Sequence, residues 1–381
     1  MRRISVIILG VGLVIAAATA QQPGQLRPRP GEGQAPEWPP PLITDYKPKS
    51  TLVVAEHPRP KAKFPVIDIH SHHFQIPSAE QFDRVVAAME SNNLRVLVNL
   101  SGGSGERLQK YLEALKASPH RDRMVLFANI DFGGGVGPGF GARAAAQLEK
   151  DIGAGALGLK IYKDLGLRLK KGDGSRLKVD DPELDPIWET CGRLGVPVLI
   201  HTAEPAPFFD PLDLTNERWL ELALYRSRRY QDPSYPRFEE LIAERDRMFA
   251  RHPKTTFIAA HMAYHANDLA RLGRLFDRLP NVYSEVAAVL AELGRQPRTA
   301  RAFFEKYQDR LLFGKDSFQP DEYPYYWRTF ETADEYFDYY RDYHAFWKLY
   351  GMDLPDAVLR KLYYANALKL IKGLPRAGFT N

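Results

Sequence analysis

The stretch Phe64–Phe74, FPVIDIHSHHF, places His70 and His72 two residues apart at the end of an apolar run. Side chains alternate between the two faces of a strand, so Asp68, His70 and His72 point to one side. Neutral imidazole is a common metal ligand, and this spacing lets both rings reach one ion. Taken alone, the stretch fits a metal-binding strand end and a polar surface turn equally well.

Seven more apolar runs follow at regular intervals, and most are separated by stretches with helical periodicity. Near-continuous apolar runs are typical of parallel strands that are buried on both faces. Eight strand–helix units in about 310 residues predict an α/β fold, a (β/α)8 TIM barrel over residues 64–373. An open Rossmann-type sheet is the alternative, but no Gly-rich phosphate loop of the required spacing follows the first run. The seven runs begin at Leu94, Met124, Ala156, Pro197, Thr256, Asn281 and Leu311.

Two connections are long and rich in aromatic residues. They follow the fifth and eighth predicted strands, over residues 205–236 and 319–351. Both leave the carboxyl end of a strand, where the active sites of barrel enzymes lie. These insertions predict an aromatic lid over an apolar or aromatic substrate. The alternative is that their aromatic side chains only pack short helices onto the barrel.

The N-terminus has the pattern of a secretory signal peptide. Arg2 and Arg3 precede an apolar run, and small residues at 18–20 form a cleavage site before Gln21. An uncleaved membrane anchor is the alternative, but the run is short for a membrane span. We therefore predict a secreted or periplasmic protein that has no membrane contact after signal cleavage. The predicted segments are a signal peptide at 1–20, a Pro/Gly-rich arm or linker at 21–63, the barrel at 64–373 and a C-terminal tail at 374–381.

The composition is that of a globular protein, with 44% hydrophobic and 26% charged residues and a net charge of +5. Basic and acidic residues are interspersed, so no nucleic-acid partner is predicted. Cys191 is the only cysteine and can form no internal disulfide, so a large core must stabilise the fold. We expect a small-molecule substrate as the partner, and a homo-oligomer is compatible with the sequence.

Polar residues stand near the ends of five of the eight predicted strands. A lone histidine in such a run is more often a core residue than a ligand. Because the carboxyl ends of barrel strands face one cavity, several histidines at matching ends predict a single metal site. The residues are His70 and His72 on the first strand, Lys160 on the fourth, His201 on the fifth, His261 on the sixth and Asp316 on the eighth.

This order of motifs resembles the amidohydrolase superfamily, in particular the branch with metal-dependent hydrolases and decarboxylases of the aminocarboxymuconate-semialdehyde type. The resemblance covers about residues 64–373 and rests on DIHSH (68–72), IHTAE (200–204), AAHMA (259–263), LLFGKDSF (311–318) and the closing helix. It implies that His70, His72 and His201 hold a divalent metal, with Asp316 as a further ligand and base. It also implies that His261 completes the coordination or polarises the substrate carbonyl.

Zinc is the first choice for a set of imidazole and carboxylate ligands, with manganese or iron as alternatives. Lys160 bears on the metal count, because some superfamily members have a carbamylated lysine on this strand that bridges two metals. A free Lys160 ammonium would instead bind a substrate carboxylate or carbonyl beside one metal, and we predict one zinc ion. Asp68 shares the face of the two histidines, so we expect it to orient one imidazole.

The predicted function is a metal-dependent hydrolase that uses activated water on an amide, ester or lactone, with an aromatic or carboxylate-bearing small substrate. The alternatives are a non-oxidative decarboxylase that uses the same site and a barrel that only binds a ligand. Glu204 is a further candidate for metal bridging or substrate binding. Lesser candidates near strand ends are Tyr162, Lys163, His265, Asp131 and Glu285, whereas His73 should point to the opposite face.

Overall fold

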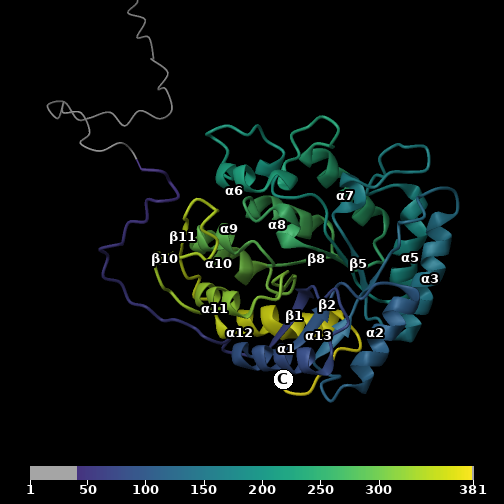
Figure 1. The fold of residues 1–381 in the computed structure, drawn as a ribbon, viewed down its shortest axis with the longest axis horizontal. Coiled ribbons are helices and arrows are strands. Elements are labelled where there is room, and N and C mark those ends of the chain that lie inside the picture. Colours follow the sequence, from purple (N-terminus) through teal and green to yellow (C-terminus); the bar gives the residue numbers. More distant parts are fainter. Residues whose placement is uncertain (1–40, 380–381) are drawn as a thin grey trace, which may run out of the picture. The chain divides into compact units, whose positions relative to one another are not determined.

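The computed structural model describes residues 41–379 of the chain, and Figure 1 shows its ribbon. The predicted signal peptide lies outside the described residues. The chain divides into two units after Thr51, and the described part of the first, residues 41–51, is exposed and contains one turn. All described helices and strands belong to the second unit. No helix in the described part is long and apolar enough to cross a membrane.

All eight predicted runs form parallel strands that pair in chain order, as a barrel requires. Their side chains are almost entirely buried, because the Val-, Ile- and Leu-rich runs face the core on both sides. The third run is broken at Phe127, so it contributes two short strands. The strands are β1 (Val66–Ser71), β2 (Leu94–Asn99), β3 (Met124–Leu126), β4 (Ala128–Asn129), β5 (Leu159–Ile161), β6 (Val198–Ile200), β7 (Phe257–Ala259), β8 (Val282–Glu285) and β9 (Leu311–Leu312).

Backbone hydrogen bonds link the two sheets, β1–β3 and β4–β9, into one ring. At the break, Phe127 N donates to Asn99 O over 3.0 Å. Between the last and first strands, Ile69 N donates to Phe313 O over 3.0 Å and Asp316 N donates to the His70 carbonyl over 2.6 Å. The bond from Asp316 N to the His70 carbonyl fixes Asp316 next to His70. The predicted (β/α)8 barrel is confirmed.

Helices follow the strands as the periodicity predicts. The first, α1, begins at a capping box in which Ser78 Oγ accepts from Gln81 N while the Gln81 side chain accepts from Ser78 N. Figure 1 shows the closing helices beside α1 and β1, so the two ends of the barrel meet. The helices after successive strands are α1 (Ala79–Asn92), α2 (Gly105–Ala117), α3 (Phe140–Ala154), α5 (Asp185–Leu194), α7 (Phe238–Arg251), α8 (Leu269–Arg278) and α10 (Pro297–Lys306), and the chain closes with α12 (Asp356–Arg360), η6 (Lys361–Ala365) and α13 (Asn366–Leu370).

The two insertions form short elements of their own at the carboxyl side of the barrel. After β6 they are η2 (Ala206–Phe208), α6 (Trp219–Leu224) and η3 (Arg226–Arg228), and after β9 they are η5 (Pro320–Glu322), α11 (Tyr323–Glu331), β10 (Phe337–Asp338) and β11 (Lys348–Leu349). Smaller pieces elsewhere are α4 (Asp164–Leu167), η1 (Pro182–Leu184), η4 (His261–Tyr264) and α9 (Leu290–Gly294).

Most aromatic residues of α11 pack the second insertion onto the barrel. Tyr323, Tyr326, Trp327 and Phe330 are fully buried. Phe313, just after β9, lies among them, with its ring centre 4.9 Å from that of Trp327 and 5.7 Å from that of Tyr326. For these residues, the structure agrees with the packing alternative rather than with a lid.

We expect Trp327→Ala to lower the free energy of unfolding by about 3–5 kcal/mol, because it leaves a large cavity under α11. The indole Nε1 has no hydrogen-bond partner among the described residues, so packing alone is lost. Urea unfolding followed by circular dichroism measures the change. Tyr336→Ala, at a half-exposed position of the same insertion, is the control and should change stability little. A Trp327 variant as stable as this control would contradict the packing role of α11.

Candidate metal centre

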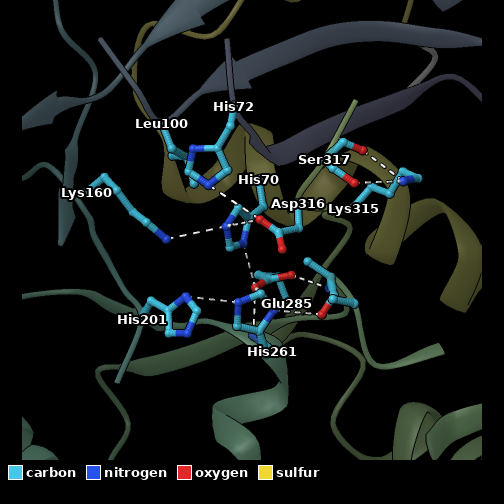
Figure 2. Close-up of polar contacts among 12 residues, drawn as sticks. His70, His72, Leu100, Lys160, His201, His261, Glu285, Lys315, Asp316 and Ser317 are labelled. Atoms are coloured by element: carbon cyan, nitrogen blue, oxygen red, sulfur yellow. Dashed lines mark hydrogen bonds and ion pairs between the residues drawn. The ribbon is translucent and has the colours of Figure 1, made fainter. Parts of the chain in front are cut away.

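Four histidines and one aspartate from different strand ends meet in the barrel mouth, and Figure 2 shows them pointing toward one another. His70 lies near the end of β1 and His72 just beyond it, while His201 directly follows β6, and His261 and Asp316 follow β7 and β9. All but Asp316 are largely buried, and its side chain is 38% exposed. The sequence therefore predicted which residues gather here.

Asp316 lies between the two histidines of the first strand. Its Oδ1 is 3.4 Å from His70 Nε2 and 3.5 Å from His72 Nε2. These three residues offer one ligand atom each within 4.8 Å of one another, and so does a second group, His70, His261 and Glu285. The side chain of His70 thus belongs to both groups and stands at the middle of the cluster.

His70 and His261 each have the outer ring nitrogen, Nδ1, held by an acceptor. His70 Nδ1 donates to Glu285 Oε1 over 2.9 Å, and His261 Nδ1 donates to the Ala287 carbonyl over 2.8 Å. A carbonyl or carboxylate oxygen can only accept, so in both neutral rings the proton is on Nδ1. Nε2 of each ring therefore presents a lone pair to the centre.

The outer nitrogen of His72 is fixed by a chain of hydroxyl groups. Tyr162 donates its proton to the Leu100 carbonyl over 3.0 Å, so Ser101 Oγ donates to the Tyr162 oxygen over 2.9 Å. Ser101 Oγ then accepts from His72 Nδ1 over 2.8 Å. His72 Nε2 is left as a lone pair that faces Asp316.

His201 also has one ring nitrogen held by a hydrogen bond, but here the nitrogen is Nε2 and the partner is Tyr264. The Tyr264 hydroxyl donates to Glu204 Oε2 over 3.1 Å, and its oxygen lies 2.6 Å from His201 Nε2, from which it accepts. Lys163 forms an ion pair with the other Glu204 oxygen. His201 Nδ1 is then unprotonated and lies 3.2 Å from the unprotonated His261 Nε2.

The protonation states of the cluster side chains agree with these hydrogen bonds. Burial lowers the pKa of His70 well below its ordinary value, that of His72 to about 3 and that of His201 to about 4, so the rings are neutral near pH 7. Burial acts to raise the pKa of Asp316, positive charge on the nearby histidines acts to lower it, and the pKa lies below its ordinary value. Asp316 is therefore an ionised carboxylate.

The donor set fits a divalent cation. Four imidazole nitrogens and one carboxylate point to one region, and two of these nitrogens, His261 Nε2 and His201 Nδ1, face each other across 3.2 Å. Such groups repel one another unless a cation lies among them, and imidazole with carboxylate is a common set for zinc and other divalent metals. The metal-binding role of each residue stays a prediction.

Asp68 does not orient an imidazole, contrary to our expectation. Its carboxylate accepts from His70 N over 2.9 Å, from Lys315 N over 3.2 Å and from the Tyr323 hydroxyl over 2.7 Å, so it fixes the backbone of the two strand ends. The carboxylate that contacts the His70 ring is Glu285, which also accepts from His261 N over 2.7 Å.

Lys160 lies in the cluster, fully buried, with Nζ 3.4 Å from His70 Nε2. Burial lowers the pKa of Lys160 to about 8, against the opposite effect of Asp316 and Glu285. An ammonium and a carbamylated lysine would each place a charge beside His70.

The lesser candidates are more scattered. Tyr162, Lys163 and Glu204 support the cluster through the contacts above. His73 Nε2 lies 3.1 Å from Ser71 Oγ, away from the centre. Asp131 accepts from Gly133 N in a separate hollow, and the buried ring of His265 contacts Phe238.

Tyr264 is a functional candidate that our sequence reasoning missed. It ends η4, where His261, Met262, Ala263 and Tyr264 all have φ between 53° and 58°. Each residue in this left-handed region costs roughly 1–2 kcal/mol, and the turn brings both His261 and Tyr264 onto His201. Nothing in the AAHMAY sequence signals such a turn, because it contains no glycine or asparagine.

A cavity of about 210 Å³ opens above the cluster, lined by His201, His261 and Asp316 below. Six of the ten insertion residues on its upper wall are charged or polar, and the two insertions meet where Arg218 donates to His344 Nε2 over 2.7 Å. This corrects the expected aromatic lid, because the aromatic side chains of α11 pack inward instead. The insertions contribute the apolar residues Pro205, Ala206, Pro207 and Phe208 and the charged or polar residues Glu217, Arg218, Glu221, Arg228, Arg341 and His344.

The chain is similar in structure to several solved proteins. A dihydroxybenzoic acid decarboxylase from Polaromonas sp. JS666, solved with manganese and 2-nitroresorcinol, is 15% identical, with a TM-score of 0.50 over 81% of this chain and 96% of that one. An uncharacterised TIM-barrel protein from Bordetella bronchiseptica is 17% identical, with a TM-score of 0.49 over 81% and 98%.

Among curated proteins, none matches the sequence significantly. A family model does: the Amidohydrolase model matches residues 67–372, which include every strand of the barrel except the first residue of β1. The matched region also contains the whole histidine and aspartate cluster. The chain therefore belongs to the amidohydrolase family of enzymes, whose members use divalent metals.

Proposed function

We propose that this protein is a metal-dependent hydrolase that cleaves a C–N or C–O bond of a small amide, ester or lactone. The observation that carries the proposal is the orientation of the four imidazoles. Their outer nitrogens are all held, so the inner ones of His70 and His72 face Asp316 and those of His201 and His261 face each other. His70, His72, His201 and Asp316 would hold one divalent ion. Zinc is preferred for this set, with manganese or iron as alternatives.

A divalent ion bound here would lower the pKa of a water molecule toward neutrality and polarise the substrate carbonyl. Asp316 is placed to take the proton of the attacking water on a carboxylate oxygen and to pass it to the leaving nitrogen or oxygen. His70 and His72 flank the Asp316 carboxylate, with their Nε2 atoms 3.4 Å and 3.5 Å from its Oδ1.

His261 was expected either to complete the metal coordination or to polarise the substrate carbonyl, and its hydrogen bonds favour the first role. The Ala287 carbonyl keeps the proton of the neutral ring on Nδ1, so Nε2 has no proton to donate to a substrate carbonyl. His261 would therefore complete the ligand set or accept a proton. Polarising a carbonyl would require the imidazolium form.

A non-oxidative decarboxylase is the second candidate. The buried Lys160 ammonium beside His70 favours it, since it could bind the carboxylate of a substrate next to the metal. We also propose that the protein is secreted or periplasmic, which rests on the sequence pattern of residues 1–20.

The test is a screen of lactones, esters, amides and aromatic carboxylic acids with metal-loaded protein in ¹⁸O-labelled water. We expect a product that carries ¹⁸O and no release of carbon dioxide. Carbon dioxide released without net uptake of water would favour the decarboxylase. If no compound turns over although metal is bound, the hydrolase proposal is contradicted and a ligand-binding barrel takes its place.

A further inference from the structure

The upper wall of the cavity carries several ion pairs, and nearly all are complete. Arg218 donates to Glu221 Oε2 over 2.8 Å and to Glu292 Oε1 over 3.0 Å. Arg228 pairs with the other oxygen of Glu221. Outside this group, Glu217 pairs with Arg295, and Glu204 pairs with Lys163. Each of these cavity carboxylates thus already has a cation.

Arg341 is different. Its side chain lines the same cavity, yet it forms no hydrogen bond or ion pair with an acidic group anywhere in residues 41–379. Its guanidinium carbon lies 5.4 Å from the centre of the Tyr340 ring. Removing a cation from water without an anionic partner is costly, so a half-buried, unpaired guanidinium favours an anionic ligand.

His344, three residues further on, leaves a second donor without a partner. His344 Nε2 lies 2.7 Å from Arg218 Nη1 and 3.3 Å from Glu221 Oε2; because Arg218 is the nearer and can only donate, Nε2 accepts from it and the proton of the neutral ring is on Nδ1. That Nδ1 has no partner among the described residues, although the side chain is only 1% exposed and belongs to the cavity wall. Buried donors are almost always satisfied, so this one indicates a missing acceptor.

We propose that Arg341 and His344 bind a carboxylate of the substrate, so that the enzyme acts on anionic small molecules that carry this group away from the scissile bond. The inference rests on the proposed function of the metal centre below. Arg341 supplies a planar fork of donors and a charge, which match the two oxygens of a carboxylate. His344 Nδ1 supplies one more donor.

The separation of the two ends of the cavity determines the kind of substrate. His201, His261 and Asp316 form the lower wall, whereas Arg341 and His344 belong to the insertion after β9. A carboxylate held at the upper wall would point the remainder of the molecule toward Asp316. Substrates without this anion would lose the upper contact and bind more weakly.

The proposal is tested by binding rather than by turnover. Glutarate and its neutral analogue glutaramide are titrated by NMR against protein stripped of metal with a chelator, so that no carboxylate can bind a metal ion. We expect glutarate to bind at least about tenfold more tightly than glutaramide, which corresponds to about 1.4 kcal/mol. Arg341→Gln should remove this preference, and Arg341→Lys should keep part of it.

Arg193→Gln is the control for net charge, because Arg193 forms an exposed pair with Glu149 on the outside of the barrel. It should bind glutarate as the wild type does. Glutaramide binding as tightly as glutarate, or an unchanged preference in Arg341→Gln, would overturn the proposal. Tighter binding of inorganic phosphate than of glutarate would also overturn it, since the site would then suit a free anion.

These outcomes are separable from those of the hydrolase test. If glutarate binds through Arg341 but no ester, lactone or amide turns over, the carboxylate site stands and the proposed reaction is wrong. If neutral substrates turn over equally well in wild type and Arg341→Gln, the reaction stands and the carboxylate site is wrong.

Discussion

Replacing Asp316 with asparagine is expected to lower kcat by about 10²–10⁴-fold, because the amide cannot accept the proton of the attacking water. The fold should be unaffected. Asp316 has a φ of 85°, and asparagine tolerates this left-handed region at least as well as aspartate. Steady-state kinetics at saturating metal, with the best substrate from the screen, measure the loss.

Asp321→Asn is the matched control, since Asp321 is an exposed residue of η5 in the same part of the chain. It should have wild-type kcat. Circular dichroism of both variants separates lost chemistry from lost structure. If Asp316→Asn turned over substrate at the wild-type rate, Asp316 could not be the base.

Glu285→Gln is expected to weaken metal binding by about 10–100-fold, the usual effect of removing a carboxylate behind a metal-bound histidine. The neutral amide makes His70 a weaker base, and its NH₂ group would meet the N–H of Ala287, which now donates to Glu285 Oε2. Competition with a fluorescent zinc chelator measures the change in affinity.

Glu106→Gln is a suitable control, because Glu106 pairs with Lys110 on the exposed surface of α2. Its metal affinity should equal that of wild type. A Glu285 variant with unchanged affinity would contradict a role in metal binding and leave Glu285 with only its backbone contacts to His261 and Ala287.

The strands were predictable because parallel strands buried on both faces require continuous apolar runs, and this chain has eight of them. The cluster of His70, His201, His261 and Asp316 followed once these runs were placed in a barrel. The break at Phe127 was not predictable, since it depends on how neighbouring strands pair and leaves the apolar pattern intact.

The contacts behind the cluster were predicted only in part. The alternation of side chains along a strand puts Asp68 on the same face as His70. It does not show which groups the carboxylate reaches, and Asp68 accepts from the backbone N–H groups of His70 and Lys315. Glu285 was only a lesser candidate from sequence. A carboxylate closing the apolar run NVYSE was the available signal for a buried partner.

The character of the cavity wall was the largest correction. Aromatic residues dominate the sequence of the second insertion, yet Trp327 and its neighbours are buried and the charged residues line the cavity. Composition cannot tell which face of a short helix is buried, because that depends on Phe313 and the barrel beneath it. Arg341 and His344 became candidates only through their missing partners.

The central claim is that the strand-end cluster binds one divalent metal ion, and the most direct test is the metal content of the purified, zinc-loaded protein by plasma mass spectrometry. We predict one equivalent for the wild type and for Lys160→Ala, and none for the double variant His70→Asn/His72→Asn. Two equivalents in wild type, with one lost in Lys160→Ala, would contradict the single-metal site. A wild type that retains no metal would contradict the central claim itself.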